Sequence, residues 1–202
     1  MKITILVEGE TERAFLPHLR IFLGSRLQGR MPRLDPFVYH GRIPKEQKLK
    51  RVVENALSTG KPPSDAVIAL TDVYTGTGDF QDAADAKRKM SGWVGPNARF
   101  FPHAAQHDFE AWLLPFWAVI QNLAGHNKAA PPGPPELVNH QQPPSARIRE
   151  IFRIGTCRGD YVKPRDAGRL LQGKDLAVAA AACPELRAFL NRILELSGGA
   201  PL

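Results

Sequence analysis

Cysteine is scarce in this chain of 202 residues, and no hydrophobic run approaches the length of a membrane-spanning helix. The two cysteines, Cys157 and Cys183, form neither a zinc-binding spacing nor a disulfide framework, which favours a reducing compartment. The sequence contains no Walker-type phosphate loop, which argues against ATP hydrolysis of the usual kind, and no secretory leader is recognisable. These absences predict a soluble cytoplasmic protein without a membrane partner.

Acidic residues are in the minority, because 27 lysines and arginines stand against 20 aspartates and glutamates, for a net charge of +7. An excess of positive charge favours an anionic partner, and nucleic acid is the commonest one. A solvated basic surface gives the same total, so the charge alone does not decide. The length suits one domain, or one domain with an elaboration, and leaves the oligomeric state open.

The most informative segment lies at the start of the chain, where the apolar run of residues 3–7 ends in carboxylates. β-Branched residues bounded by glycine predict a buried strand, and Gly9 permits a tight exit. We expect Glu8 at the carboxyl end of this strand and Glu12 in the first turn of the following helix. Carboxylates that converge there repel each other by roughly 4 kcal/mol per close pair, and a divalent cation would compensate. Solvent separation of the side chains is the alternative, and Glu12 could equally complement the helix dipole.

Apolar strands and amphipathic helices alternate along the first two thirds of the sequence. The expected strands cover residues 3–7, 34–39, 66–70 and 98–101, and the expected helices cover residues 12–27, 45–57, 82–90 and 107–121. This alternation predicts an α/β fold, a Rossmann-like, mostly parallel sheet flanked by helices.

The C-terminal third has a different composition. Residues 1–124 are predicted to form the α/β domain, and residues 125–145 a proline-rich loop. Residues 146–202 are predicted to form a helical appendage packed on the same domain, with a basic helix over residues 146–152 and two further helical stretches.

Acids recur at the ends of the later expected strands. Asp72 follows the apolar run 66–70, beside an expected glycine-containing loop at residues 75–78, and Asp108 and Glu110 follow the fourth expected strand. Because the carboxyl ends of parallel strands meet at one edge of a sheet, where ligands bind, we expect these acids to converge with those of the first strand. Asp72 could instead make a local turn, and Asp108 could simply cap a helix.

These segments resemble the TOPRIM catalytic domain of topoisomerases, primases and the overcoming-lysogenization-defect (OLD) nucleases. The chain is more closely similar to a small TOPRIM-like family of bacterial proteins, and the likeness spans nearly its whole length. The matching runs are Val7-Glu8-Gly9-Glu10-Thr11-Glu12, Asp72-Val73-Tyr74, Gln106-His107-Asp108-Phe109-Glu110-Ala111-Trp112-Leu113 and Cys183-Pro184-Glu185-Leu186.

The resemblance implies phosphodiester hydrolysis of nucleic acid, DNA in the first instance, with Mg²⁺ or Mn²⁺. It also implies pairing with an ATPase in anti-phage defence. Glu8 would be a metal ligand or general base, Glu12 a supporting ligand and Asp72 the main ligand. The candidate catalytic residues are therefore Glu8, Glu12, Asp72 and Glu110, and the candidate metal ligands are Glu8, Glu12, Asp72 and Asp108.

One position departs from the TOPRIM pattern. The second acid of the Asp-x-Asp pair is Tyr74 here, which removes one ligand of a two-metal site. Asp79, Asp82 or Glu110 could substitute, or the site could hold a single ion. A hard cation with oxygen ligands suits either arrangement.

Basic residues in two expected helices are candidate phosphate contacts, although a charge run is also typical of a solvated helix face. These candidates are Lys45, Lys48, Lys50, Arg51, Arg147, Arg149 and Arg153. The sequence thus leaves three functions open: a metal-dependent nuclease, a non-catalytic module that binds nucleic acid or a partner ATPase, and hydrolysis of nucleotides or other phosphoryl groups.

Overall fold

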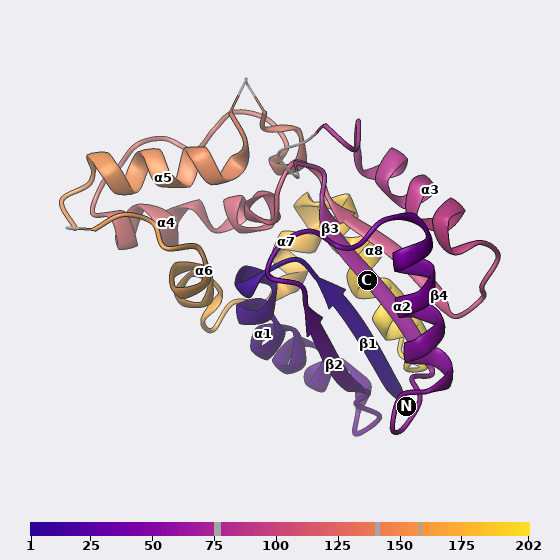
Figure 1. The fold of residues 1–202 in the computed structure, drawn as a ribbon. Coiled ribbons are helices and arrows are strands. Elements are labelled where there is room, and N and C mark those ends of the chain that lie inside the picture. The colour runs from indigo at the N-terminus through magenta and orange to yellow at the C-terminus, as the bar shows by residue number, and fades with distance from the viewer. Residues whose placement is uncertain (75–77, 140–141, 158) are drawn as a thin grey trace.

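A four-stranded parallel sheet organises the molecule, which is described here from a computed structural model covering residues 1–74, 78–139, 142–157 and 159–202 (Figure 1). The strands are β1 (Lys2–Val7), β2 (Arg33–Val38), β3 (Ala66–Asp72) and β4 (Phe100–Ala105). Their order is β2-β1-β3-β4, and all three pairings are parallel. The predicted α/β class with a parallel sheet is confirmed.

Helices follow each strand. They are α1 (Glu10–Leu27), α2 (Glu46–Ser58), α3 (Ala83–Val94), the 3₁₀ helix η1 (Phe109–Phe116), α4 (Trp117–Ala124), the 3₁₀ helix η2 (Pro135–Leu137), α5 (Pro144–Ile154), α6 (Lys163–Leu171), α7 (Leu176–Ala182) and α8 (Pro184–Leu196). In the described part of the chain, no helix is long and apolar enough to cross a membrane.

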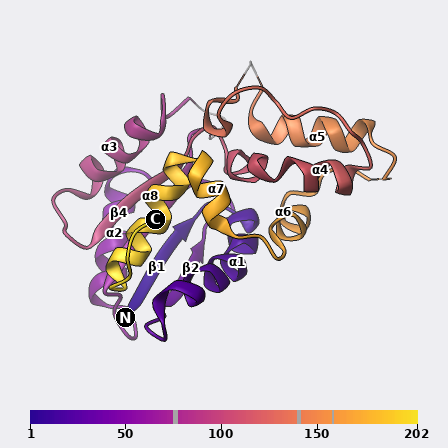
Figure 2. The ribbon, with the colours of Figure 1, turned by 180° about the vertical axis from the view of Figure 1, so that it is seen from behind.

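The sheet separates two hydrophobic clusters, because successive side chains of a strand point to opposite faces. Ile3 and Ile5 of β1 pack with α1 and α8, whereas Leu6 packs with α2 and α3. Figures 1 and 2 show the resulting three layers, with α2 and α3 over one face and α1 and α8 over the other. The ring centroids of Phe15 in α1 and Phe189 in α8 lie 6.4 Å apart, so the last helix packs against α1 in the hydrophobic cluster that also contains Ile3 and Ile5 of β1.

Both outer strands contain a proline, Pro36 in β2 and Pro102 in β4. Proline has no backbone N–H to donate, so it is tolerated in an edge strand, which has a partner strand on one side only. The expected strand over residues 98–101 lies too early in the sequence. The observed strand begins at Phe100 and continues through Pro102, which lies opposite Ala69, to Ala105.

Two helix predictions were wrong. Residues 107–121 were expected to form one helix, but a 3₁₀ helix precedes α4, and Pro115 lies inside it without an N–H for regular α-helical bonding. Within residues 159–202, three helices follow α5, where two were expected. Pro184 explains the extra break, because it cannot continue α7 and instead occupies the first turn of α8.

The C-terminal third packs against the rest of the chain. Helices α4 and α5 lie side by side at one end of the molecule (Figures 1 and 2). Ile148 of α5 and Leu190 of α8 belong to the same hydrophobic cluster as Ile5 of the sheet. The domain boundaries proposed from composition stay a prediction, and residues 75–77 of the expected loop at 75–78 lie outside the described residues.

Candidate functional site at the carboxyl edge of the sheet

Five carboxylates lie at the carboxyl edge of the sheet. Glu8 directly follows β1, and Glu12 lies in the first turn of α1. Asp72 is the last residue of β3. Asp108 precedes η1, and Glu110 lies in its first turn. Parallel strands in register bring these ends together, since Val7 lies opposite Leu70 and Asp72 lies opposite Ala105.

Glu8 is a half-buried carboxyl group held by the neighbouring strand. Its Oε1 accepts a hydrogen bond of 2.5 Å from the hydroxyl of Thr71. Burial raises the pKa of Glu8 to about 7, and the charge of Glu12 adds to this effect, while hydrogen bonds from Thr71 and from the backbone oppose it. The group is therefore poised to exchange a proton near neutral pH.

Glu12 is buried, and its Oε2 accepts a hydrogen bond from the backbone N–H of Gly9 at 3.1 Å. This contact is one half of a capping box, so the helix role foreseen as an alternative for Glu12 is present. Burial raises the pKa of Glu12, and the ammonium group of Lys163 opposes the shift.

Asp72 is the electrostatic centre of the cluster. Burial raises its pKa well above the usual value. The charges that add to this effect come from Glu12, Asp108, Glu8 and Glu110. All four other acids therefore act on one carboxyl group, and all five lie after β1, β3 and β4 at the same edge of the sheet.

The two acids after β4 are fixed by the C-terminal third of the chain. Asp108 Oδ2 accepts a hydrogen bond of 3.2 Å from the backbone N–H of Ser145. Its Oδ1 is buried without a hydrogen-bond partner among the described residues. Glu110 is fully buried and accepts hydrogen bonds from the Tyr161 hydroxyl at 3.2 Å and from Lys163 Nζ at 2.9 Å. Burial, with the charge of Asp108, raises the pKa of Glu110 to about 7.

Comparison with known proteins bears on this arrangement. The family model described as "Domain of unknown function (DUF4276)" matches residues 7–194. The chain belongs to this family. Comparison with curated proteins finds no match.

Two solved structures share the fold of this DUF4276 protein. The C-terminal region of the Burkholderia pseudomallei OLD protein aligns with a TM-score of 0.55 and 16% identity over 96% of this chain and 98% of that chain. The C-terminal region of the Xanthomonas campestris pv. campestris OLD protein aligns with a TM-score of 0.51 and 15% identity, over 97% of this chain and 93% of that chain. At such identities the likeness establishes the fold, which confirms the fold implied by the resemblance to OLD proteins.

Lys163 and Tyr161 of this DUF4276 domain were missed by the sequence analysis. Burial lowers the pKa of Lys163, but the charges of Glu110, Asp108 and Asp72 outweigh it, so the pKa of the ammonium group is raised overall. Lys163 is the first residue of α6, where a cation is opposed by the helix dipole. That unfavourable placement is the signal in the sequence that could have identified it.

Two of the residues suggested as substitutes for the missing second acid are engaged elsewhere. Asp79 Oδ1 lies 2.6 Å from Lys45 Nζ, and its Oδ2 lies 3.7 Å from Arg42. Asp82 caps α3 by accepting a hydrogen bond of 2.7 Å from the backbone of Asp85. The third, Glu110, lies within the cluster but is paired with Lys163.

A small cavity adjoins Glu8, and the ion pair between Lys45 and Asp79 forms part of its wall. Glu8, Thr71, Arg42, Lys45 and Asp79 line it. Arg42 and Lys45 thus carry positive charge to the rim of the acidic cluster. Arg42 was not among the residues singled out from the sequence, because it precedes the helical pattern.

The other predicted phosphate contacts fall into two separate groups. Lys48 and Arg51 are exposed on α2, and Lys50 is half-buried there. On α5, Arg149 and Arg153 are exposed, and Arg147 lies 4.0 Å from Glu150. Helices α2 and α5 lie at opposite ends of the molecule in both views, so these groups do not form one patch (Figures 1 and 2).

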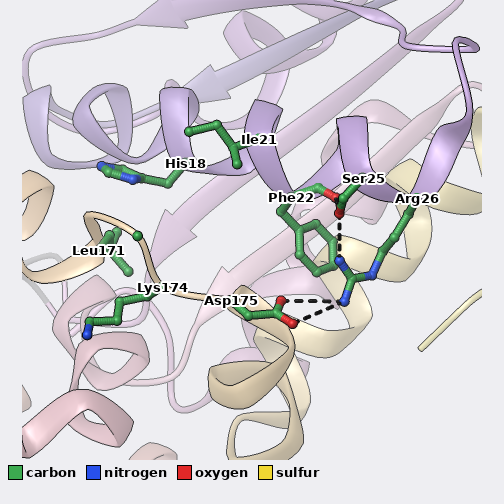
Figure 3. Close-up of a pocket in the computed structure, with 9 residues that line it drawn as sticks. His18, Ile21, Phe22, Ser25, Arg26, Leu171, Lys174 and Asp175 are labelled. Carbon is green, nitrogen blue, oxygen red and sulfur yellow. Dashed lines mark hydrogen bonds and ion pairs between the residues drawn. The ribbon is translucent and has the colours of Figure 1, made fainter.

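A larger pocket lies between α1 and the link from α6 to α7, and none of the five acids lines it (Figure 3). Arg26 crosses it to Asp175 at 3.4 Å and stands 4.0 Å above the ring of Phe22. The pocket is therefore closed off by an ion pair at one side and carries no part of the acidic site.

The donor set at the sheet edge suits a hard divalent ion. Carboxylate oxygens are the ligands that Mg²⁺ prefers, and the mutual repulsion around Asp72 and the unpartnered Oδ1 of Asp108 would both be relieved by a cation. Within the described residues, no three Asp, Glu, His or Cys side chains are arranged so that they could hold one ion together. The carboxylates thus suit a divalent ion by chemistry and charge, but in the described part of the chain their present arrangement does not bring three of them around one ion, and Glu12, Asp108 and Glu110 also bond to other groups.

Proposed function

We propose that this protein hydrolyses phosphodiester bonds of nucleic acid with the help of Mg²⁺ or Mn²⁺ held at the carboxyl edge of the sheet. The observation that carries the proposal is the position of five carboxylates at the carboxyl edge of the sheet, after β1, β3 and β4. A surplus of buried negative charge is costly unless a cation compensates it, and sites of this kind cluster at functional positions.

Asp72 and Asp108 are the proposed metal ligands, with Glu12 in a supporting role. A bound divalent ion would activate water and neutralise charge on the phosphate in the transition state. Glu8 is either a further ligand or the general base that accepts the proton of the attacking water. Its raised pKa, about 7, suits the second role.

The positive groups have separate proposed roles. Lys163 holds Glu110 in place and lowers the negative charge that the substrate phosphate meets. Arg42 and Lys45 line the cavity beside Glu8 and would contact the phosphate backbone of the bound strand. The exposed cations of α2 and α5 would attract nucleic acid without reading its sequence.

The likeness to TOPRIM proteins that share the Val7–Glu12 run supports this proposal, as does the fold shared with OLD C-terminal regions. Association with an ATPase and a role in anti-phage defence are part of the proposal on the same ground. Purification of the intact protein with candidate ATPases tests that association.

Cleavage of labelled single-stranded and duplex DNA and RNA, with Mn²⁺ and with Mg²⁺, tests the activity. We expect Asp72→Asn to lower the rate at least about 100-fold, since removal of one charge-stabilising group typically has this effect. Glu195→Gln, which removes an exposed carboxylate from α8, is the matched control and should cleave at the wild-type rate. Equal cleavage by wild type and Asp72→Asn, or no cleavage of any of these substrates, would overturn the proposal.

A second candidate is a non-catalytic module that binds nucleic acid. Tyr74 stands where the TOPRIM pattern has its second acid, and Glu110 is tied to Lys163. This alternative predicts binding without cleavage, with an affinity that falls steeply as salt increases.

A further inference from the structure

Tyr74 follows the last residue of β3, Asp72, by two positions and is 44% exposed. Its backbone is fixed, because the N–H of Tyr74 donates to the carbonyl of His107 at 2.7 Å and the N–H of Val73 donates to that of Ala105 at 3.1 Å. An aromatic ring is thus presented to solvent on a rigid extension of β3.

The ring of His107 packs next to the ring of Tyr74. The two ring centroids lie 5.2 Å apart, with 36° between the planes. His107 is 8% exposed, and its Nδ1 has no hydrogen-bond partner among the described residues. The pair therefore presents an exposed aromatic ring that packs against a second, buried ring.

The position of the pair relates it to the acids. Tyr74 lies two residues after Asp72, so their Cα atoms are at most about 7 Å apart. His107 directly precedes Asp108. A nucleotide whose phosphate lies against Asp72 would bring its base within reach of the Tyr74 ring.

We propose that Tyr74, supported by His107, is a stacking platform for an unpaired base, so that the preferred substrate is single-stranded nucleic acid or an unpaired strand end. This inference rests on the proposed function, because the phosphate next to the stacked base is the one held at the acidic cluster. In a duplex the faces of internal bases are covered by their neighbours, so the platform can accept only a base that is not stacked within a helix. Every base has an aromatic face, so the platform confers no sequence preference.

Binding of a labelled single-stranded oligonucleotide and of the matching duplex, in buffer with Ca²⁺, tests the platform directly. Tyr74→Ala should weaken single-strand binding roughly 5- to 150-fold, the range of one lost base–aromatic stack, and leave duplex binding within about twofold. Tyr74→Phe keeps the ring and should bind like wild type. Phe37→Ala is the matched control, since Phe37 is an exposed aromatic residue of the edge strand β2.

Cleavage kinetics separate this inference from the proposed function. With single strands, Tyr74→Ala should raise KM by a similar factor and leave kcat within about threefold of wild type. If wild type cleaves but Tyr74→Ala matches it in binding and KM, the platform is wrong and the nuclease proposal stands. If nothing is cleaved but single-strand binding depends on the ring, the nuclease proposal fails and the platform stands. Equal losses for single strand and duplex would also overturn the platform.

Discussion

Lys163 Nζ donates a hydrogen bond of 2.9 Å to Glu110 Oε2 across a separation of 53 positions in the sequence. Glu110 is fully buried, whereas the side chain of Lys163 is 36% exposed. The start of α6 thus delivers the positive charge that directly pairs with an acid of the cluster. This pair links the C-terminal third of the chain to the chemistry at the sheet edge.

Replacement of Lys163 by methionine should destabilise the protein by about 2 kcal/mol at pH 8, because the ionised Glu110 would lose its partner. The cost should shrink at pH 5, since the pKa of Glu110 is about 7 and the carboxyl group is then protonated. Urea denaturation at both pH values measures this difference.

The double variant Lys163→Met/Glu110→Gln tests whether the two side chains are coupled. It should recover most of the lost stability at pH 8, because no buried charge is left unpaired. Equal instability of the single and double variants would show that the two side chains are not coupled.

The stability of the protein should depend on the ionisation of Glu8. Its folded-state pKa, about 7, lies above the ordinary value of 4.5, so the folded state binds the proton more tightly than the unfolded chain. The contribution to stability is complete below pH 4.5 and is lost as the pH rises through 7, for a total of at most on the order of 3 kcal/mol.

Thermal unfolding of wild type and Glu8→Gln in EDTA, from pH 5 to pH 8, tests this dependence. The free energy of unfolding of the variant should exceed that of wild type increasingly as the pH rises. A difference that stays constant, or that grows toward low pH, contradicts the raised pKa.

Glu136 joins the proline-rich segment to the last helix. Its carboxylate accepts hydrogen bonds from Trp112 Nε1 at 2.9 Å and from the backbone N–H groups of Glu185 at 3.1 Å and Leu186 at 3.4 Å. It thereby caps the N-terminus of α8 from a distant part of the chain. Glu136→Ala should cost about 2–3 kcal/mol, because the buried indole N–H and the helix end both lose their acceptor.

Chemical denaturation measures this loss, with Glu185→Gln as the control. Glu185 pairs with Lys87 at a partly exposed position, so its change should cost less than about 1 kcal/mol. A comparable loss in both variants would mean that the cap is no stronger than a surface ion pair.

The positions of Glu8 and Asp72 at the ends of two strands could be predicted from the sequence. Glu8 and Asp72 each follow a continuous apolar run, and a run of that kind forms a buried parallel strand whose end faces the ligand edge. The convergence then follows from strand order, which the alternation of strands and helices restricts strongly.

Other parts of the site carry no periodic signal. Lys163, Tyr161 and Ser145 reach the acids from segments whose path depends on tertiary packing alone. The 3₁₀ geometry of η1 was hidden because Phe109–Phe116 is apolar apart from Glu110, so its pattern does not distinguish one kind of helix from another. The cap by Glu136 was missed because a contact between segments far apart in the chain leaves no local mark in the sequence.

Calorimetric titration of the metal-free protein with Mn²⁺ tests the central claim most directly. Wild type and the control variant Glu195→Gln should bind the ion with equal affinity, and Asp72→Asn should lose at least about tenfold, because Asp72 is the proposed ligand at the end of β3. No binding by wild type, or equal binding by wild type and Asp72→Asn, would contradict a metal site at the carboxyl edge of the sheet.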